Sequence, residues 1–165
     1  MTMANSIPPR IGISQCLLGE HVRYDGGHKR DDFLIEALGR YAEWVPVCPE
    51  VEVGLGTPRE PMQLVGDLQA PRLVTINTGV DHTDAMHRFA QQRVRELEAL
   101  NLSGFVFKSG SPSCGIGEVS FVVGLFARAF MAHFPLMPVE DEDRLHDPQT
   151  LENFLERVRD YRAGG

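Results

Sequence analysis

Apolar residues recur along the chain in two patterns, short runs and helical spacing, which predict strands and helices respectively. The runs predict buried strands at residues 11–18, 44–48 and 104–108, and weaker strand patterns occupy residues 62–67, 73–77 and 136–139. Pro138 favours an edge position for the last of these, because proline cannot donate a backbone hydrogen bond to a neighbouring strand. Helical spacing predicts helices at residues 31–41, 83–100 and 124–134, and a last helix that starts at Pro148.

The predicted strands and helices alternate, and two helix starts carry capping residues. Asp31 or Asp32 is the expected N-cap of the first helix, and Asp147 is expected to open the last helix just before Pro148. Alternation favours an α/β fold with a mostly parallel sheet and helices on both faces. Because the sequence shows no internal repeat and no Gly/Ser linker, we expect a flexible N-terminal tail at residues 1–10 and one domain at residues 11–165.

Composition and charge narrow the class of protein. The 165 residues are 42% hydrophobic and 24% charged, which is ordinary for a soluble domain. The longest apolar stretch, residues 121–131, contains Arg128 and is shorter than the roughly 20 residues that span a bilayer, so no membrane association is expected. The first residues do not resemble a secretion signal, which predicts a cytoplasmic protein. The net charge of -7 disfavours a broad nonspecific surface for nucleic acid.

Three cysteines, Cys16, Cys48 and Cys114, are the first candidates for chemistry. An odd number of cysteines without a secretion signal disfavours a disulfide framework and favours metal binding or catalysis. Each cysteine lies at or just beyond the end of a predicted strand. Parallel α/β sheets bind ligands beyond the carboxyl ends of their strands. If these strands are neighbours, the three thiols face one pocket.

The residue types alone leave several kinds of site open. Thiolates are soft ligands that suit zinc, copper(I) or iron-sulfur centres. A structural zinc ion takes four ligands, and His28 or His133 could supply the fourth. A 4Fe-4S cluster held by three thiolates instead leaves one iron open for a substrate, and spacing favours it only slightly over zinc. A cysteine hydrolase that pairs one thiol with a histidine is a further candidate.

The segments around the cysteines resemble those of a known family, the bacterial thiouracil desulfidases. The resemblance extends over about residues 11–162 and is specific because three motifs occur in order. They are Ile13-Ser14-Gln15-Cys16-Leu17-Leu18-Gly19, then Pro46-Val47-Cys48-Pro49-Glu50, and finally Lys108-Ser109-Gly110-Ser111-Pro112-Ser113-Cys114-Gly115. Membership implies a Rossmann-like domain in which a 4Fe-4S cluster is held by Cys16, Cys48 and Cys114.

The resemblance also implies a reaction, the desulfuration of a thiolated pyrimidine of the thiouracil or thiouridine type. Water replaces sulfur at carbon, which gives the carbonyl base and sulfide without net redox change. Such chemistry needs a base and a hydrogen-bond donor. Glu50, two residues after Cys48, is the candidate base, Ser111 the candidate donor or proton relay, and Asp25 a candidate for orienting the substrate. Turn formation is the competing interpretation for Ser111 and Asp25.

The expected substrate is a small thiolated base or nucleoside. Thiolated tRNA is the second candidate, because longer relatives with an added C-terminal domain are associated with it, but the acidic balance of this chain favours the small molecule. The alternative function is an iron-sulfur or zinc protein whose metal is structural or sensory, without turnover. The sequence carries no signal for the oligomeric state.

Overall fold

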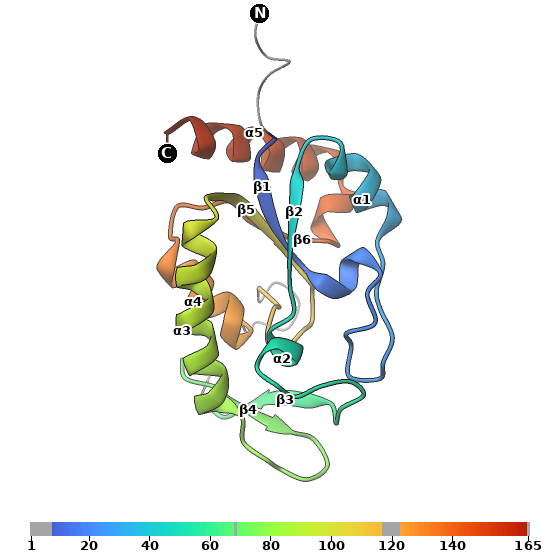
Figure 1. Ribbon diagram of the computed structural model, residues 1–165, viewed down its shortest axis with the longest axis vertical. Coiled ribbons are helices and arrows are strands. Elements are labelled where there is room, and N and C mark those ends of the chain that lie inside the picture. The colour runs from blue at the N-terminus through green and yellow to red at the C-terminus, as the bar shows by residue number, and fades with distance from the viewer. Residues whose placement is uncertain (1–7, 68, 117–122, 165) are drawn as a thin grey trace, which may run out of the picture.

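The computed structural model describes residues 8–67, 69–116 and 123–164. Its centre is a four-stranded sheet in the order β2-β1-β5-β6, in which every neighbouring pair is parallel. These strands are β1 (Arg10–Ser14), β2 (Glu43–Val47), β5 (Leu102–Phe107) and β6 (Val139–Asp141). A separate antiparallel pair, β3 (Met62–Val65) and β4 (Arg72–Thr75), lies below the carboxyl ends of the sheet strands (Figure 1).

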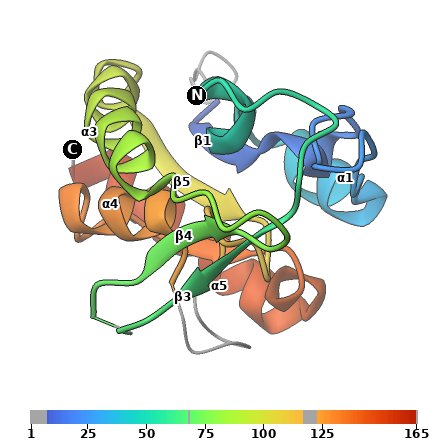
Figure 2. The same cartoon turned by 90° about the horizontal axis from the view of Figure 1, so that it is seen from below.

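Helices cover both faces of the sheet, as expected. Figure 2 shows α3 and α4 on one side of β5 and α1 on the other. The helices are α1 (Asp32–Gly39), α2 (Pro49–Glu52), α3 (Thr83–Ala99), α4 (Leu125–His133) and α5 (Pro148–Gly164), with 3-10 turns η2 (Gln15–Leu18) and η3 (Arg144–His146). Among the described residues, no helix has the length and apolar character needed to cross a bilayer.

Successive side chains of β5 point to opposite faces of the sheet, where they join two different core clusters. Phe105 and Phe107 stack at 4.2 Å between ring centroids and pack with Phe126 and Phe130 of α4. Val106 points to the opposite face and joins the cluster formed with α1 and α5. On β1, a Cβ at Gly12 would lie 2.2 Å from the Phe105 ring. Glycine at this position therefore lets the ring pack across the middle of the sheet.

The predicted elements are largely confirmed, and so are the two caps. Asp31 accepts a hydrogen bond from the Leu34 amide at 2.9 Å, and Asp147 accepts one from the Thr150 amide at 3.0 Å. The last strand lies at the sheet edge as predicted, but it covers Val139–Asp141, so only Val139 of the predicted range belongs to it and Pro138 precedes it. Arg10, which we expected in the tail, opens β1. The rest of the expected tail at residues 1–7, and residue 165, lie outside the described residues.

Near the cysteines, the structure departs from the predicted elements at two places. The first strand ends at Ser14, and the apolar residues after it form the 3-10 turn η2, in which Leu17 is fully buried. A short apolar run fits a buried strand and a buried turn equally, so its pattern could not separate them. After Cys48 the chain forms the short helix α2, which the sequence pattern did not predict. Cys48 itself is the N-cap of that helix, and Pro49 occupies its first position.

Candidate active site

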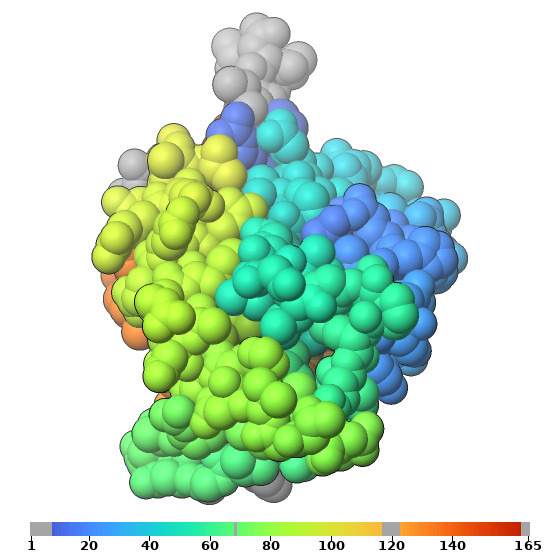
Figure 3. All heavy atoms as spheres, turned by 60° about the horizontal axis from the view of Figure 1, so that its bottom comes forward, coloured from blue at the N-terminus to red at the C-terminus, as the bar shows by residue number. Residues whose placement is uncertain are grey.

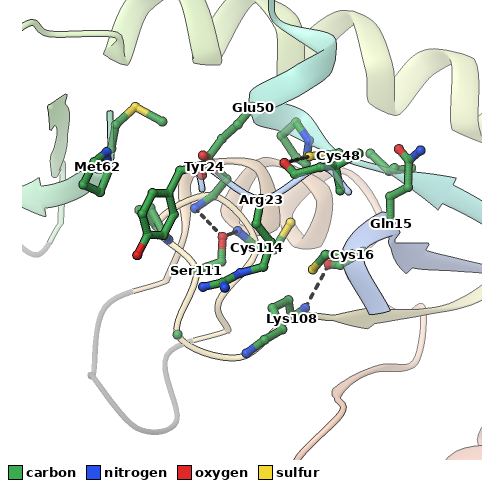
Figure 4. Close-up of a pocket in the computed structure, with 18 of the residues that line it drawn as sticks. Gln15, Cys16, Arg23, Tyr24, Cys48, Glu50, Met62, Lys108, Ser111 and Cys114 are labelled. Carbon is green, nitrogen blue, oxygen red and sulfur yellow. Dashed lines mark hydrogen bonds between the residues drawn. The ribbon is translucent and has the colours of Figure 1, made fainter. Parts of the chain in front are cut away.

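A cavity of about 230 Å³ lies at the carboxyl ends of β1, β2 and β5. In the space-filling view of this end, α2 and the β3-β4 pair form much of the surface (Figure 3). The cavity is lined by Cys16 of η2, Cys48 at the start of α2 and Cys114 of the loop after β5. Figure 4 shows the three side chains around one space. The fold thus brings together thiols that are far apart in the sequence, as a parallel sheet with β1 between β2 and β5 allows.

The three cysteines are free thiols, of which Cys16 and Cys48 are partly buried and Cys114 is buried. Burial, followed by the neighbouring charge of Cys48, raises the pKa of Cys16 to about 11. Burial also raises the pKa of Cys48, and it raises the pKa of Cys114 well above its ordinary value. Cys114 is only 5% exposed. A metal cation bound by the three sulfurs would lower these pKa values, because its positive charge stabilises the thiolate, which is the form that ligates metals.

Ser14, the last residue of β1, contacts both the residue that follows β5 and the side chain of Cys114. Its Oγ accepts the Lys108 backbone N–H at 2.8 Å, and its hydroxyl hydrogen-bonds to the Cys114 side chain, which partly offsets the rise in the thiol pKa. Ser14 is 3% exposed. We did not single out this residue from the sequence. A polar side chain at the end of a buried strand, two residues before a cysteine, was the available signal.

The loop that carries Cys114 is held by Ser111. The Ser111 Oγ accepts the backbone N–H groups of Ser113 at 3.1 Å and Cys114 at 3.0 Å, and the Ser111 carbonyl accepts the N–H of Gly115 at 2.8 Å. Ser111 also lines the cavity (Figure 4). Both sequence interpretations therefore meet in one residue, which shapes the turn and presents its hydroxyl to the cavity.

The same loop packs against the first turn of α4. The amides of Leu125 and Ala127 donate to the carbonyls of Pro112 and Ser113 at 3.1 and 3.0 Å. A Cβ on Gly124, the N-cap of α4, would lie 2.4 Å from the Ser113 carbonyl carbon. This contact distance admits glycine alone, so Gly124 sets the position of the Cys114 loop.

Glu50 of α2 points into the cavity and has both carboxylate oxygens engaged. Its Oε1 lies 2.8 Å from Arg59 Nε, and its Oε2 accepts the Ser113 hydroxyl at 3.0 Å. The side chains of Arg59 and Glu50 are only 8% and 12% exposed. Because Glu50 follows Cys48 by two residues and Ser113 precedes Cys114, the carboxylate connects two of the three cysteine segments.

The remaining wall of the cavity is cationic and aromatic. The Arg23 guanidinium lies 5.4 Å from the centre of the Tyr24 ring, and both residues line the cavity (Figure 4). Lys108 also lines it, but its ammonium pairs with Glu142 at 3.0 Å and donates to the Ser109 carbonyl at 2.7 Å. Arg59 pairs with Glu50.

The comparison with known proteins identifies the family. The sequence profile of the 2-thiouracil desulfurase family matches residues 11–142. The chain belongs to the 2-thiouracil desulfurase family. It is similar to the solved structure of the [4Fe-4S]-dependent thiouracil desulfidase TudS, with a TM-score of 0.67 and 33% identity over 88% of this chain and 97% of that one. It is also 32% identical to the uncharacterised protein YbbK of Bacillus subtilis (strain 168), over 66% of this chain and 75% of YbbK.

Asp25 does not line the cavity. Its Oδ1 accepts the Gly27 backbone N–H at 2.8 Å, and this hydrogen bond is the main reason that the pKa of Asp25 lies below its ordinary value. Arg23 approaches its other oxygen at 3.5 Å. The geometry is that of an aspartate that shapes a turn before glycines.

The two histidines considered as a fourth zinc ligand do not line the cavity either. His133 pairs with Glu98 at 2.6 Å, and His28 accepts the Arg30 backbone N–H at 3.1 Å. Within residues 8–67, 69–116 and 123–164, no three His, Cys, Asp or Glu side chains are grouped closely enough to hold a single metal ion. A cluster does not require such a group, since each thiolate binds a different iron.

Proposed function

We propose that this protein hydrolyses the C=S bond of thiolated pyrimidines, giving the carbonyl base and sulfide. Water contributes its oxygen to carbon and its protons to the departing sulfur, so the overall reaction needs no oxidant or reductant. Family membership and the similarity to TudS support the reaction class. The observation that carries the proposal is the cavity in which three thiols from separate segments surround one space beside Glu50.

The donor set fits an iron-sulfur cluster. Three soft thiols line a cavity of about 230 Å³, and Arg23 and Lys108 lie near enough to Cys16 to favour its charged form. We propose that Cys16, Cys48 and Cys114 hold a 4Fe-4S cluster. When bound, a cluster with three protein ligands supplies one iron that can act as a Lewis acid toward the thiocarbonyl sulfur.

Glu50 is the proposed base that removes a proton from the attacking water. A carboxylate offers about four acceptor positions, and the contacts with Arg59 and Ser113 occupy two of them. The other two acceptor positions of the carboxylate remain for water. Because the side chain is 12% exposed and held at both oxygens, it needs little reorganisation when the proton moves.

Ser111 is the proposed donor to charge that develops on the substrate. Its oxygen already accepts two backbone N–H groups. A hydroxyl has one donor and two acceptor positions, so the hydrogen is the part of the group left for another partner. That hydrogen can be donated into the cavity, to a ring atom of the base or to a water.

The cavity suits a flat heterocycle. Tyr24 offers an aromatic face, while Pro61 and Met62 add apolar lining. Stacking on an aromatic side chain is a common way to hold a base without reading its sequence context. We therefore propose a free thiolated base or its nucleoside as substrate, with tRNA as the second candidate.

The test is anaerobic purification followed by reaction with 2-thiouracil in H₂¹⁸O. We expect iron and acid-labile sulfide in the protein, equal amounts of uracil and sulfide, and one ¹⁸O atom in the uracil. A fully loaded protein that releases no sulfide would point to a sensory or structural cluster. Stoichiometric zinc in place of iron would overturn both the cofactor and the reaction, and activity that survives iron removal would favour a cysteine hydrolase.

A further inference from the structure

Arg59 is the residue on which the cavity wall around Glu50 depends. Its Nε contacts Glu50 Oε1 at 2.8 Å, and its Nη1 donates to the Gly56 carbonyl at 2.8 Å. Its backbone N–H donates to the Tyr24 carbonyl at 2.6 Å. The side chain is 8% exposed and lines the cavity. Arg59 thus connects the proposed base to the loop that carries Tyr24.

The orientation of the Glu50 carboxylate follows from these contacts. Arg59 contacts one oxygen of the carboxylate, and the Ser113 hydroxyl donates to the other. The two partners come from different loops, the one after α2 and the one that carries Cys114. Rotation of the carboxylate would break both contacts at once. Net stability does not explain such an arrangement well, because desolvation offsets most of the attraction in a buried ion pair.

A second arginine–glutamate pair on the same helix gives a matched comparison. Glu52, two residues after Glu50, pairs with Arg93 of α3 at 2.9 Å, with side-chain exposures of 19% for Arg93 and 28% for Glu52. Neither Arg93 nor Glu52 lines the cavity. The two pairs anchor the same short helix, and Glu52 Oε2 also accepts the Cys48 backbone N–H at 2.8 Å. Only the Arg59 pair lines the cavity, and Arg93→Ala leaves the Glu52–Cys48 contact in place.

We propose that Arg59 is a positioning residue that acts through Glu50, holding the carboxylate where it can take a proton from the attacking water. The inference rests on the proposed function. It assigns to Arg59 the alignment of the base and leaves substrate binding to the other wall of the cavity.

The experiment compares Arg59→Ala, Arg59→Lys and Arg93→Ala with the wild-type holoenzyme, under anaerobic conditions and with 2-thiouracil. For Arg59→Ala we expect a kcat about 100-fold lower, since a misplacement of about 1 Å at a reacting group has this effect. KM should stay within about 2-fold, because ground-state binding is not touched. For Arg59→Lys we expect a kcat about 10-fold lower than that of the wild type, because an ammonium group restores the charge of arginine but not its planar geometry. Arg93→Ala should keep wild-type kcat.

Chemical rescue separates alignment from a general structural role. Arg59 lines the cavity, so truncation to alanine leaves a space that a small cation can enter from solvent. Added guanidinium should restore kcat of Arg59→Ala severalfold and should leave Arg93→Ala unchanged, with sodium chloride at equal ionic strength as the reference. Iron and acid-labile sulfide per chain, with circular dichroism, report cluster loading and folding independently of activity.

Failure of the proposed function and failure of the Arg59 inference give different results. A loaded wild-type protein without turnover would end the proposed function. A normal kcat in Arg59→Ala would overturn the inference alone, and a raised KM at unchanged kcat would make Arg59 a substrate-binding residue instead. Lost iron in both Arg59 variants would show a structural role and would also overturn it. If Arg59→Ala does not fold, the Arg59→Lys variant decides, because a wild-type kcat there contradicts the need for a planar guanidinium.

Discussion

The two walls of the cavity are built differently. On one wall, Glu50 is held by Arg59 and Ser113, and the side chains of the ion pair are 8% and 12% exposed. On the other wall, the Arg23 guanidinium lies 5.4 Å from the centre of the Tyr24 ring, and Tyr24 is 38% exposed. The contact of Arg23 with Asp25 is long, at 3.5 Å.

This difference suggests that one wall of the site carries out proton transfer and the other binds the substrate. Groups that move protons benefit from fixed positions in a water-poor setting, where electrostatic interactions are strongest. Groups that admit a substrate must remain accessible and can tolerate small displacements. We therefore expect substitutions on the Glu50 wall to change iron loading or kcat, and substitutions on the Tyr24 wall to change KM.

We call the wall that carries Glu50, Ser113 and Cys114 the fixed wall, and the wall that carries Arg23 and Tyr24 the open wall. The largest expected effect on the fixed wall is that of Cys114→Ser. A hydroxyl is a poor ligand for iron, and the buried loop around Cys114 leaves little room for a replacement ligand. We expect most of the iron to be lost and, with the cluster, almost all of the activity. Iron analysis and sulfide release measure both effects. A fully loaded and active variant would contradict the ligand assignment.

Glu50→Gln should separate the chemistry of the fixed wall from its architecture. Glutamine has nearly the same shape, so its amide can accept from Arg59 and donate to the Ser113 oxygen. We expect iron content near normal and kcat lowered by about 100-fold to 10,000-fold, the usual contribution of a general base. Arg93→Ala, which removes the arginine partner of Glu52 on the same helix, is the control, with wild-type kcat expected. Loss of the cluster in Glu50→Gln would make the carboxylate structural.

Tyr24→Leu should act on the open wall alone. Loss of an aromatic face typically costs about 1 kcal/mol or more of base binding, so we expect KM to rise roughly 10-fold with kcat little changed. Tyr24→Phe keeps the ring and should bind substrate like the wild type. Steady-state kinetics on both variants checks the expectation, and a fall in kcat without a change in KM would remove the distinction between the walls.

The smallest effect is expected for Asp25→Asn. The residue does not line the cavity, and asparagine can accept the same hydrogen bond from Gly27. We expect kcat and KM within about 2-fold of the wild type. A clear loss of activity would restore the substrate-orienting role that the sequence suggested for Asp25, and kinetics at saturating and limiting thiouracil would reveal it.

Local patterns predicted the secondary structure well where they were long or strongly periodic. The helices α3 and α4 match the predicted ranges within two residues at each end. The 3-10 turn around Cys16 and the helix α2 after Cys48 were missed, because runs of four residues are too short to show a period. Both errors fall where the chain leaves a strand and enters the site.

The amino-acid sequence by itself determined the α/β class, the three cysteine motifs and the candidate base, since these depend on residue type and on local spacing. Only the tertiary structure decided which side chains meet. Ser113 reaches Glu50 across 63 positions of sequence, and Lys108 reaches Ser14 across 94. The strand order β2-β1-β5-β6 places those segments side by side. Pairing between distant strands depends on packing throughout the core, which no local pattern records.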